Sequence, residues 1–128
     1  MDAIKKIIDD KTIYDISGRV DTQTAPDLQD ILDSDLDNFA QNQKKVNLVL
    51  NMKNVEYLSS ASLRTVLYVK KRLDAFENDS SLLIVNEIPE VREVFEMTGF
   101  TDFLVFGLMD ENGQIKENPE IETSESSE

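Results

Sequence analysis

The sequence predicts a single α/β domain built on a mixed, mostly parallel sheet, with an N-terminal hairpin and about three crossover helices. Short apolar runs bounded by polar residues, at 48–50 and 82–85, are typical of strands inside a sheet. These runs alternate with segments that carry apolar residues at helical spacing. Parallel strands need crossovers of this size, and such crossovers are right-handed, so the order β-β-α-β-α-β-α-β follows.

The length of 128 residues suits one domain with a substantial core. We expect the domain to cover residues 1–115. Residues 116–128 hold one lysine and five glutamates and few apolar residues, so we expect a disordered acidic tail. No apolar run approaches the roughly 20 residues of a membrane helix, and MDAIKKIIDD lacks the pattern of a signal peptide. We therefore expect no membrane insertion and a cytoplasmic location.

The composition removes several kinds of chemistry. The chain has neither cysteine nor histidine, which excludes a thiol nucleophile, an imidazole base and the common zinc sites. It contains no GxxxxGK[ST], GxGxxG or GxSxG motif. We therefore expect no enzyme activity, no cofactor and no metal. A small hydrolase that uses some of the many carboxylates stays as a remote alternative.

The net charge of −13 predicts the kind of partner. Such an acidic protein repels phosphate backbones and anionic membranes, so we expect no binding to nucleic acid. A protein partner with a basic surface fits better. A charge that serves only solubility is the alternative, and both readings stay open.

The first half of the chain should form a hairpin and a helix. We expect residues 3–8 to pair with residues 12–20, around a turn at residues 9–11. A helix should then run from Pro26 to about Ala40, with Thr24 able to cap it, because proline suits the first helical turn. Its outer face should be solvated and acidic, with Asp30, Asp33, Asp35 and Asp37.

The second half continues the alternation of strands and helices. A strand at residues 46–51 should lead through a short connector to a serine cluster and a helix that ends near Phe76. A strand at 81–85 and a helix from Pro89 to Met97 follow, and Gly99 is a typical C-terminal stop. We expect the last full strand at residues 102–108, a turn at 110–113, and a brief pairing at residues 114–115.

The turn before the central helix is the predicted functional site. Ser59 and Ser60 lie there, at the edge of the sheet where open α/β folds place their sites. A helix N-terminus accommodates a phosphate, and a phosphorylated serine there adds about −1.5 to −2 charge without melting the helix. Arg64, one turn further on, is placed to pair with it. The alternative is that Ser59 or Ser60 only caps the helix, a contribution of about 1 kcal/mol.

Three stretches resemble the STAS domain of bacterial anti-sigma factor antagonists and sulfate transporters. MKNVEYLSSASLRTVL is similar to the family signature, and in it Ser60 matches the serine that is phosphorylated. SGRVDTQTA resembles the loop that carries Asp21, Thr22 and Thr24. VREVFEMTGFTDFLVF resembles the third helix and last strand, so the likeness covers roughly residues 4–107.

The resemblance implies a phosphorylation-switched binding module, with a STAS-like fold over residues 1–115. The unphosphorylated form would bind a serine-kinase anti-sigma factor and so release a sigma factor. That kinase would phosphorylate Ser60, and a PP2C-type phosphatase would restore it. The implied partner-binding residues lie in the loop and at the helix start: Asp21, Thr22, Thr24, Ser59, Ser60, Ala61, Ser62 and Arg64. On chemistry alone, Asp21 is equally suited to a local Asx-type turn.

The sequence departs from the family pattern at two positions beside Ser60. Ser59 stands where the family has aspartate, and Ser62 stands where it has glycine. A serine at position 62 predicts weakened or redirected partner recognition, because glycine there allows close approach of a partner backbone. The chain also lacks an obvious C-terminal helix. These departures favour the alternative of a constitutive STAS subunit of a transporter or signalling scaffold.

Overall fold

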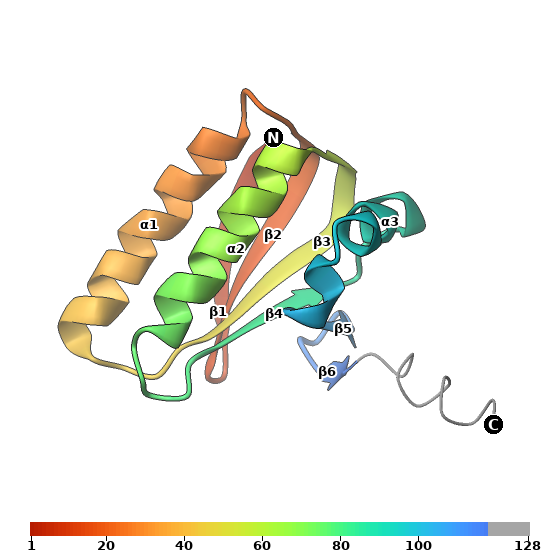
Figure 1. The fold of residues 1–128 in the computed structure, drawn as a ribbon. Coiled ribbons are helices and arrows are strands. Elements are labelled where there is room, and N and C mark those ends of the chain that lie inside the picture. The colour runs from red at the N-terminus through yellow and green to blue at the C-terminus, as the bar shows by residue number, and fades with distance from the viewer. Residues whose placement is uncertain (118–128) are drawn as a thin grey trace.

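A computed structural model describes residues 1–117 and confirms the predicted α/β class (Figure 1). Its elements follow in the order β1 (Asp2–Ile8), β2 (Lys11–Val20), α1 (Ala25–Asn42), β3 (Asn47–Leu58), α2 (Ser60–Asp74), β4 (Ser81–Val85), α3 (Pro89–Met97), a 3₁₀ turn η1 (Phe100–Asp102), β5 (Val105–Met109) and β6 (Ile115–Glu117). Residues 118–128, most of the predicted tail, lie outside the described residues. Lys116 belongs to β6, so the domain continues past the expected boundary at residue 115.

The strands form one mixed sheet in the spatial order β1-β2-β3-β4-β5-β6. β2, β3, β4 and β5 run parallel, each joined to the next by a helix. β1 pairs antiparallel with β2 as the predicted hairpin, and β6 pairs antiparallel with β5. Each crossover moves one strand further in the same direction, so crossovers of one hand place all three helices on the same face.

The main core lies between the helices and the sheet. Leu48, Leu50 and Met52 of β3 point to the helix side and are at most 1% exposed. Leu32 of α1 and Phe95 of α3 belong to the same apolar cluster. A strand buries alternate residues on one face, so one row of β3 supplies the floor on which the helices pack.

The face without helices has a smaller apolar cluster. Ile13, Val49 and Val85 are at most 2% exposed there, although no helix covers them. Met109 and Ile115, from the two sides of the C-terminal hairpin, pack against this cluster. The hairpin between β5 and β6 therefore covers part of the second face.

Two strand boundaries differ by more than two residues from those that the sequence predicts. β3 runs on to Leu58, so the expected connector after Asn51 is strand paired with the end of β2. Two irregularities in the β2–β3 register break the alternation of buried residues there, which hides the strand in the sequence. β5 begins at Val105 rather than at residue 102, because residues 100–102 form a 3₁₀ turn after the left-handed Gly99.

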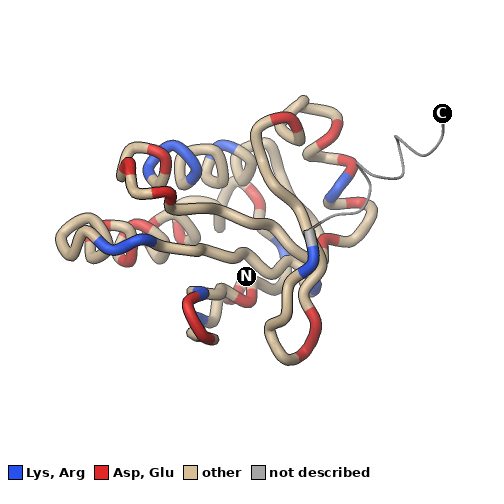
Figure 2. The backbone as a smooth tube through the Cα atoms, turned by 90° about the horizontal axis from the view of Figure 1, so that it is seen from below, with Lys and Arg blue, Asp and Glu red and all other residues tan. Residues whose placement is uncertain are grey.

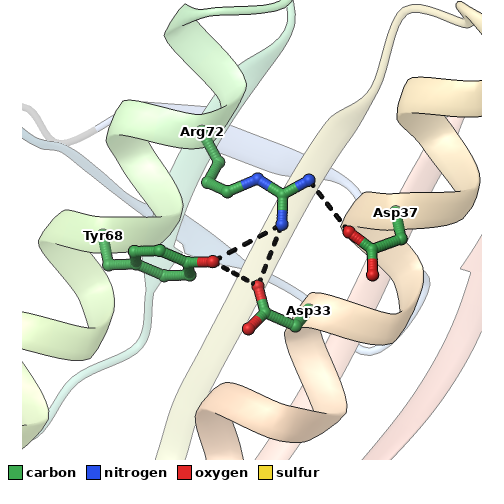
Figure 3. Close-up of polar contacts among 4 residues, drawn as sticks. All are labelled: Asp33, Asp37, Tyr68 and Arg72. Atoms are coloured by element: carbon green, nitrogen blue, oxygen red, sulfur yellow. Dashed lines mark hydrogen bonds and ion pairs between the residues drawn. The ribbon is translucent and has the colours of Figure 1, made fainter.

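The acidic face of α1 was predicted to be solvated, and this was wrong for Asp33 and Asp35, whereas Asp37 is exposed although it contacts Arg72. Asp33 accepts hydrogen bonds from the Tyr68 hydroxyl at 2.7 Å and from Arg72 at 3.0 Å, and Asp37 accepts one from Arg72 at 3.1 Å. Figure 3 shows this cluster bridging α1 and α2. Asp35 forms an ion pair with Lys5. The Arg72 cluster joins the two helices at their exposed sides.

Charge is unevenly distributed over the three helices (Figure 2). Acidic residues recur along α1 and α3, whereas basic residues predominate on α2. No helix formed by residues 1–117 is long and apolar enough to cross a membrane. The same residues contain no cluster of carboxylates that could hold a metal ion.

Candidate functional site

The end of β2 and the start of α2 meet at one point of the sheet edge. The Ser59 N–H donates to the Val20 carbonyl at 3.0 Å, which continues the pairing of β2 and β3 up to the helix start. Ser59 is the N-cap of α2, and its side chain accepts a hydrogen bond from the Ser62 N–H at 3.3 Å. The capping role predicted for Ser59 or Ser60 thus belongs to Ser59.

The serines of the turn differ in what their hydroxyls do. The Ser62 side chain is fully buried and donates to the Val20 carbonyl, and its oxygen lies 3.0 Å from that of Ser59. Ser59 is 9% exposed. Ser60 is exposed, and its hydroxyl forms no hydrogen bond with residues 1–117. Only Ser60 offers a free hydroxyl at this turn.

The burial of Ser62 explains the departure from glycine at this position. Its backbone is helical, so no residue with a positive φ is needed. Its side chain points inward and fastens the turn to β2 instead of facing outward. The Ser62 side chain therefore adds nothing to the outer surface of the turn, and its effect on partner recognition stays a prediction.

The loop that carries Asp21 lies directly before α1. The Asp21 carboxylate accepts hydrogen bonds from the N–H groups of Gln23 at 3.0 Å and Thr24 at 3.1 Å, which is the predicted Asx-type turn. The bond from the Thr24 N–H, more than any other contact, lowers the pKa of Asp21 below its ordinary value. Thr24 is the N-cap residue but makes no side-chain cap; its hydroxyl donates to the Arg19 carbonyl at 3.0 Å instead.

A shallow groove runs between the starts of α1 and α2. Thr22, Ala25 and Pro26 line one side, and Ala61 and Arg64 line the other. The structure therefore brings together three of the residues predicted to bind a partner, Thr22, Ala61 and Arg64. Within residues 1–117, Arg64 has no ion pair and is exposed. This leaves its guanidinium available to an anion from outside the fold.

One contact at this edge is not predicted by the sequence. Arg19 of β2 stacks on the ring of Tyr57 of β3, with its guanidinium carbon 4.3 Å from the ring centroid. The two residues are register neighbours, and Tyr57 is 41% exposed. A parallel register linking residues 19 and 57 is a long-range feature without a local signal. Finding it requires both the continuation of β3 to Leu58 and the two shifts in its register with β2.

Comparisons with known proteins agree on one family and one fold. The STAS domain model matches residues 2–116. The Bordetella bronchiseptica protein BtrV, named as a candidate anti-sigma factor antagonist, is 36% identical over 93 residues, which cover 73% of this chain and 74% of BtrV.

Solved structures share the fold at lower identity. An anti-sigma factor antagonist from Mycobacterium paratuberculosis has a TM-score of 0.70 at 20% identity, over 82% of this chain and 83% of that one. The anti-sigma factor antagonist SpoIIAA, a Bacillus cell fate determinant, is similar in two forms. The unphosphorylated form has a TM-score of 0.68 at 15% identity, over 98% of this chain and 97% of SpoIIAA. The phosphorylated form has 0.62 at 12%, over 99% and 100%.

Proposed function

The chain belongs to the STAS domain family, and on this premise we propose that it is an anti-sigma factor antagonist, a binding module rather than an enzyme. Its unphosphorylated form binds a serine-kinase anti-sigma factor and so releases a sigma factor. The kinase transfers a phosphoryl group from ATP to Ser60, and the phosphorylated protein dissociates from the kinase. A PP2C-type phosphatase removes the phosphate and resets the module.

The observation that carries this proposal is the free hydroxyl of Ser60. It is exposed at the first residue of α2, whereas Ser59 and Ser62 bond to each other and are buried. A kinase can therefore reach Ser60 without opening the turn. The helix N-terminus supports a dianion at this position through its free N–H groups and dipole.

The physical effect of phosphorylation is a change of surface with little change of fold. The phosphate adds about −1.5 to −2 charge to a protein of net charge −13. A partner surface that accepts an uncharged hydroxyl must then desolvate a dianion, so affinity falls. Arg64 lies one turn from Ser60 and is placed to hold the phosphate on the protein itself. The two forms of SpoIIAA support the idea that this fold carries a phosphate.

The test is phosphorylation by the cognate kinase with ATP and Mg²⁺, followed by phosphosite mapping and titration of the kinase with both forms. We expect a single phosphate on Ser60, none on Ser60→Ala, and weaker binding by the phosphorylated protein and by Ser60→Asp. Ser34→Ala, at an exposed serine of α1, is the matched control and should behave like the parent.

Two results would contradict the switch. One is clean phosphorylation at another residue. The other is binding of the kinase with equal affinity by the parent, Ser60→Ala and Ser60→Asp. Stable partner binding with Ser60 unmodified in cells would instead favour the constitutive STAS subunit.

A further inference from the structure

β1 leaves the longer edge of the sheet without a neighbouring strand. It has seven residues and, among residues 1–117, pairs only with β2, whereas β6 at the opposite edge has three. An edge strand presents a row of backbone N–H and C=O groups that can pair with another strand. β1 therefore offers a longer row of backbone groups for pairing with another strand than β6 does.

The side chains of β1 favour contact rather than repulsion. Ile4 and Ile7 are each 66% exposed, one on each face of the strand, so both faces of this edge are apolar. Lysines usually protect such an edge. Here Lys5 is drawn back to Asp35 of α1 at 3.1 Å, and Lys6 to Asp15 of β2 at 3.1 Å. The two cations are thus largely paired within the protein itself.

Symmetry limits how two copies of β1 can pair antiparallel. A two-fold axis perpendicular to the sheet leaves the same face of both copies on the same side. Directly opposed residues must point to the same face, so the axis has to pass midway between one residue and the same residue of the second copy. An axis at Lys5 or Lys6 places two lysines directly opposite each other, which is destabilising. An axis at Ile7 would require Asp9 to pair opposite Lys5 of the second copy, but Asp9 has a φ of 56° and lies outside the strand.

An axis at Ile4 gives a complementary pairing. Ile4 then faces Ile4 of the second copy, and Asp2 faces Lys6 of the second copy on each side of the axis. The flanking charges are opposite and the centre is apolar, which is the favourable cross-strand arrangement. Ala3 faces Lys5, so no like charges oppose each other.

We propose that a second copy of this chain pairs antiparallel along β1, centred on Ile4. The two six-stranded sheets join into one continuous sheet. Because the strands run in opposite directions, the edges that carry Ser60 point away from each other. Each copy keeps its own Ser60 and groove accessible, so the dimer presents two binding sites.

Single cysteines test the register directly, because the parent chain has none. Directly opposed residues of an antiparallel pair have Cα atoms about 4.5–5.5 Å apart, within the about 4.4–6.8 Å that a disulfide spans. Ile4→Cys should therefore form a disulfide-linked dimer readily under mild oxidation. Ile7→Cys is the matched control: it is equally exposed, but its two copies would lie about 20 Å apart in this register. Equal and slow cross-linking of the two variants would overturn the proposal.

Charge substitution in the otherwise unmodified full chain provides an independent test. At moderate ionic strength, which screens the repulsion between two acidic copies, sedimentation equilibrium should show a concentration-dependent dimer. Asp2→Lys should weaken it, because lysines would then face each other. The double variant Asp2→Lys/Lys6→Gln, which removes the facing lysine without placing a carboxylate beside Asp15, should recover part of the loss. A parent that stays monomeric up to the highest soluble concentration refutes the dimer, and a double variant no better than Asp2→Lys refutes the register.

Discussion

Replacing Ser62 with alanine is expected to lower the free energy of unfolding by about 1 kcal/mol. The Ser62 hydroxyl is fully buried and bridges the Val20 carbonyl and the Ser59 hydroxyl. Its loss leaves both acceptor oxygens paired, because Val20 still accepts the Ser59 N–H at 3.0 Å and the Ser59 oxygen still accepts the Ser62 N–H at 3.3 Å. The Ser59 O–H, which donates to the Ser62 oxygen because the Ser62 hydroxyl donates to Val20, loses its acceptor, but Ser59 is 9% exposed and water can replace it. The cost therefore falls near about 1 kcal/mol rather than the about 3 kcal/mol of an unsatisfied buried group.

Ser62→Gly should cost more, about 2 kcal/mol, because glycine adds about 0.5–1 kcal/mol of backbone entropy within a helix. Urea denaturation measures these differences, and each kcal/mol corresponds to roughly 4 °C in the midpoint of thermal unfolding. Ser60→Ala is the matched control in the same turn and should stay within about 0.5 kcal/mol of the parent, because its hydroxyl is exposed. A Ser62→Gly variant as stable as the parent would refute the bridging role. A Ser60→Ala variant as unstable as Ser62→Ala would refute the assignment of the free hydroxyl.

Two further predictions concern the sheet and its hairpins. Gly113→Ala and Gly99→Ala each place a side chain at a positive φ, but only at Gly113 would the new Cβ lie 2.9 Å from Ile8 Cδ1. Gly113→Ala should therefore unfold more easily than Gly99→Ala, by about 1 kcal/mol in urea, and equal stability would contradict the contact. Burial, and then the hydrogen bond to Asp35, raise the pKa of Tyr14 above its ordinary value, so its stabilising effect is complete below about pH 10 and is lost as pH rises through the folded pKa. The stability advantage of the parent over Tyr14→Phe should shrink between neutral and strongly alkaline pH, and a constant difference would argue against this titration.

The order and type of the elements could be predicted because their signals are local. Pro26 and Pro89 each lie in the first turn of a helix, and the strand at residues 81–85 has the predicted bounds. The continuation of β3 to Leu58 could not be predicted, because irregular pairing with β2 replaces the alternation by which a strand is recognised. The pairing of Asp33 with Arg72, which lies 39 residues away, has no local signal either. Helical periodicity shows which side of a helix faces outward but not which neighbour meets it.

The candidate site likewise has features that the sequence predicts and features that depend on the fold. Residue pattern and composition are enough to show that a serine cluster begins a helix after a strand, and that the chain has no histidine or cysteine to make the cluster catalytic. Which serine is free was decided only by the tertiary structure. The Val20 carbonyl belongs to β2, 42 residues earlier in the chain, and accepts the hydrogen bond that keeps the Ser62 side chain inside the turn. Ser59 caps the helix. Successive residues of a helix point about 100° apart, so Ser60 is left facing solvent, and that direction depends on how the helix is docked against β2.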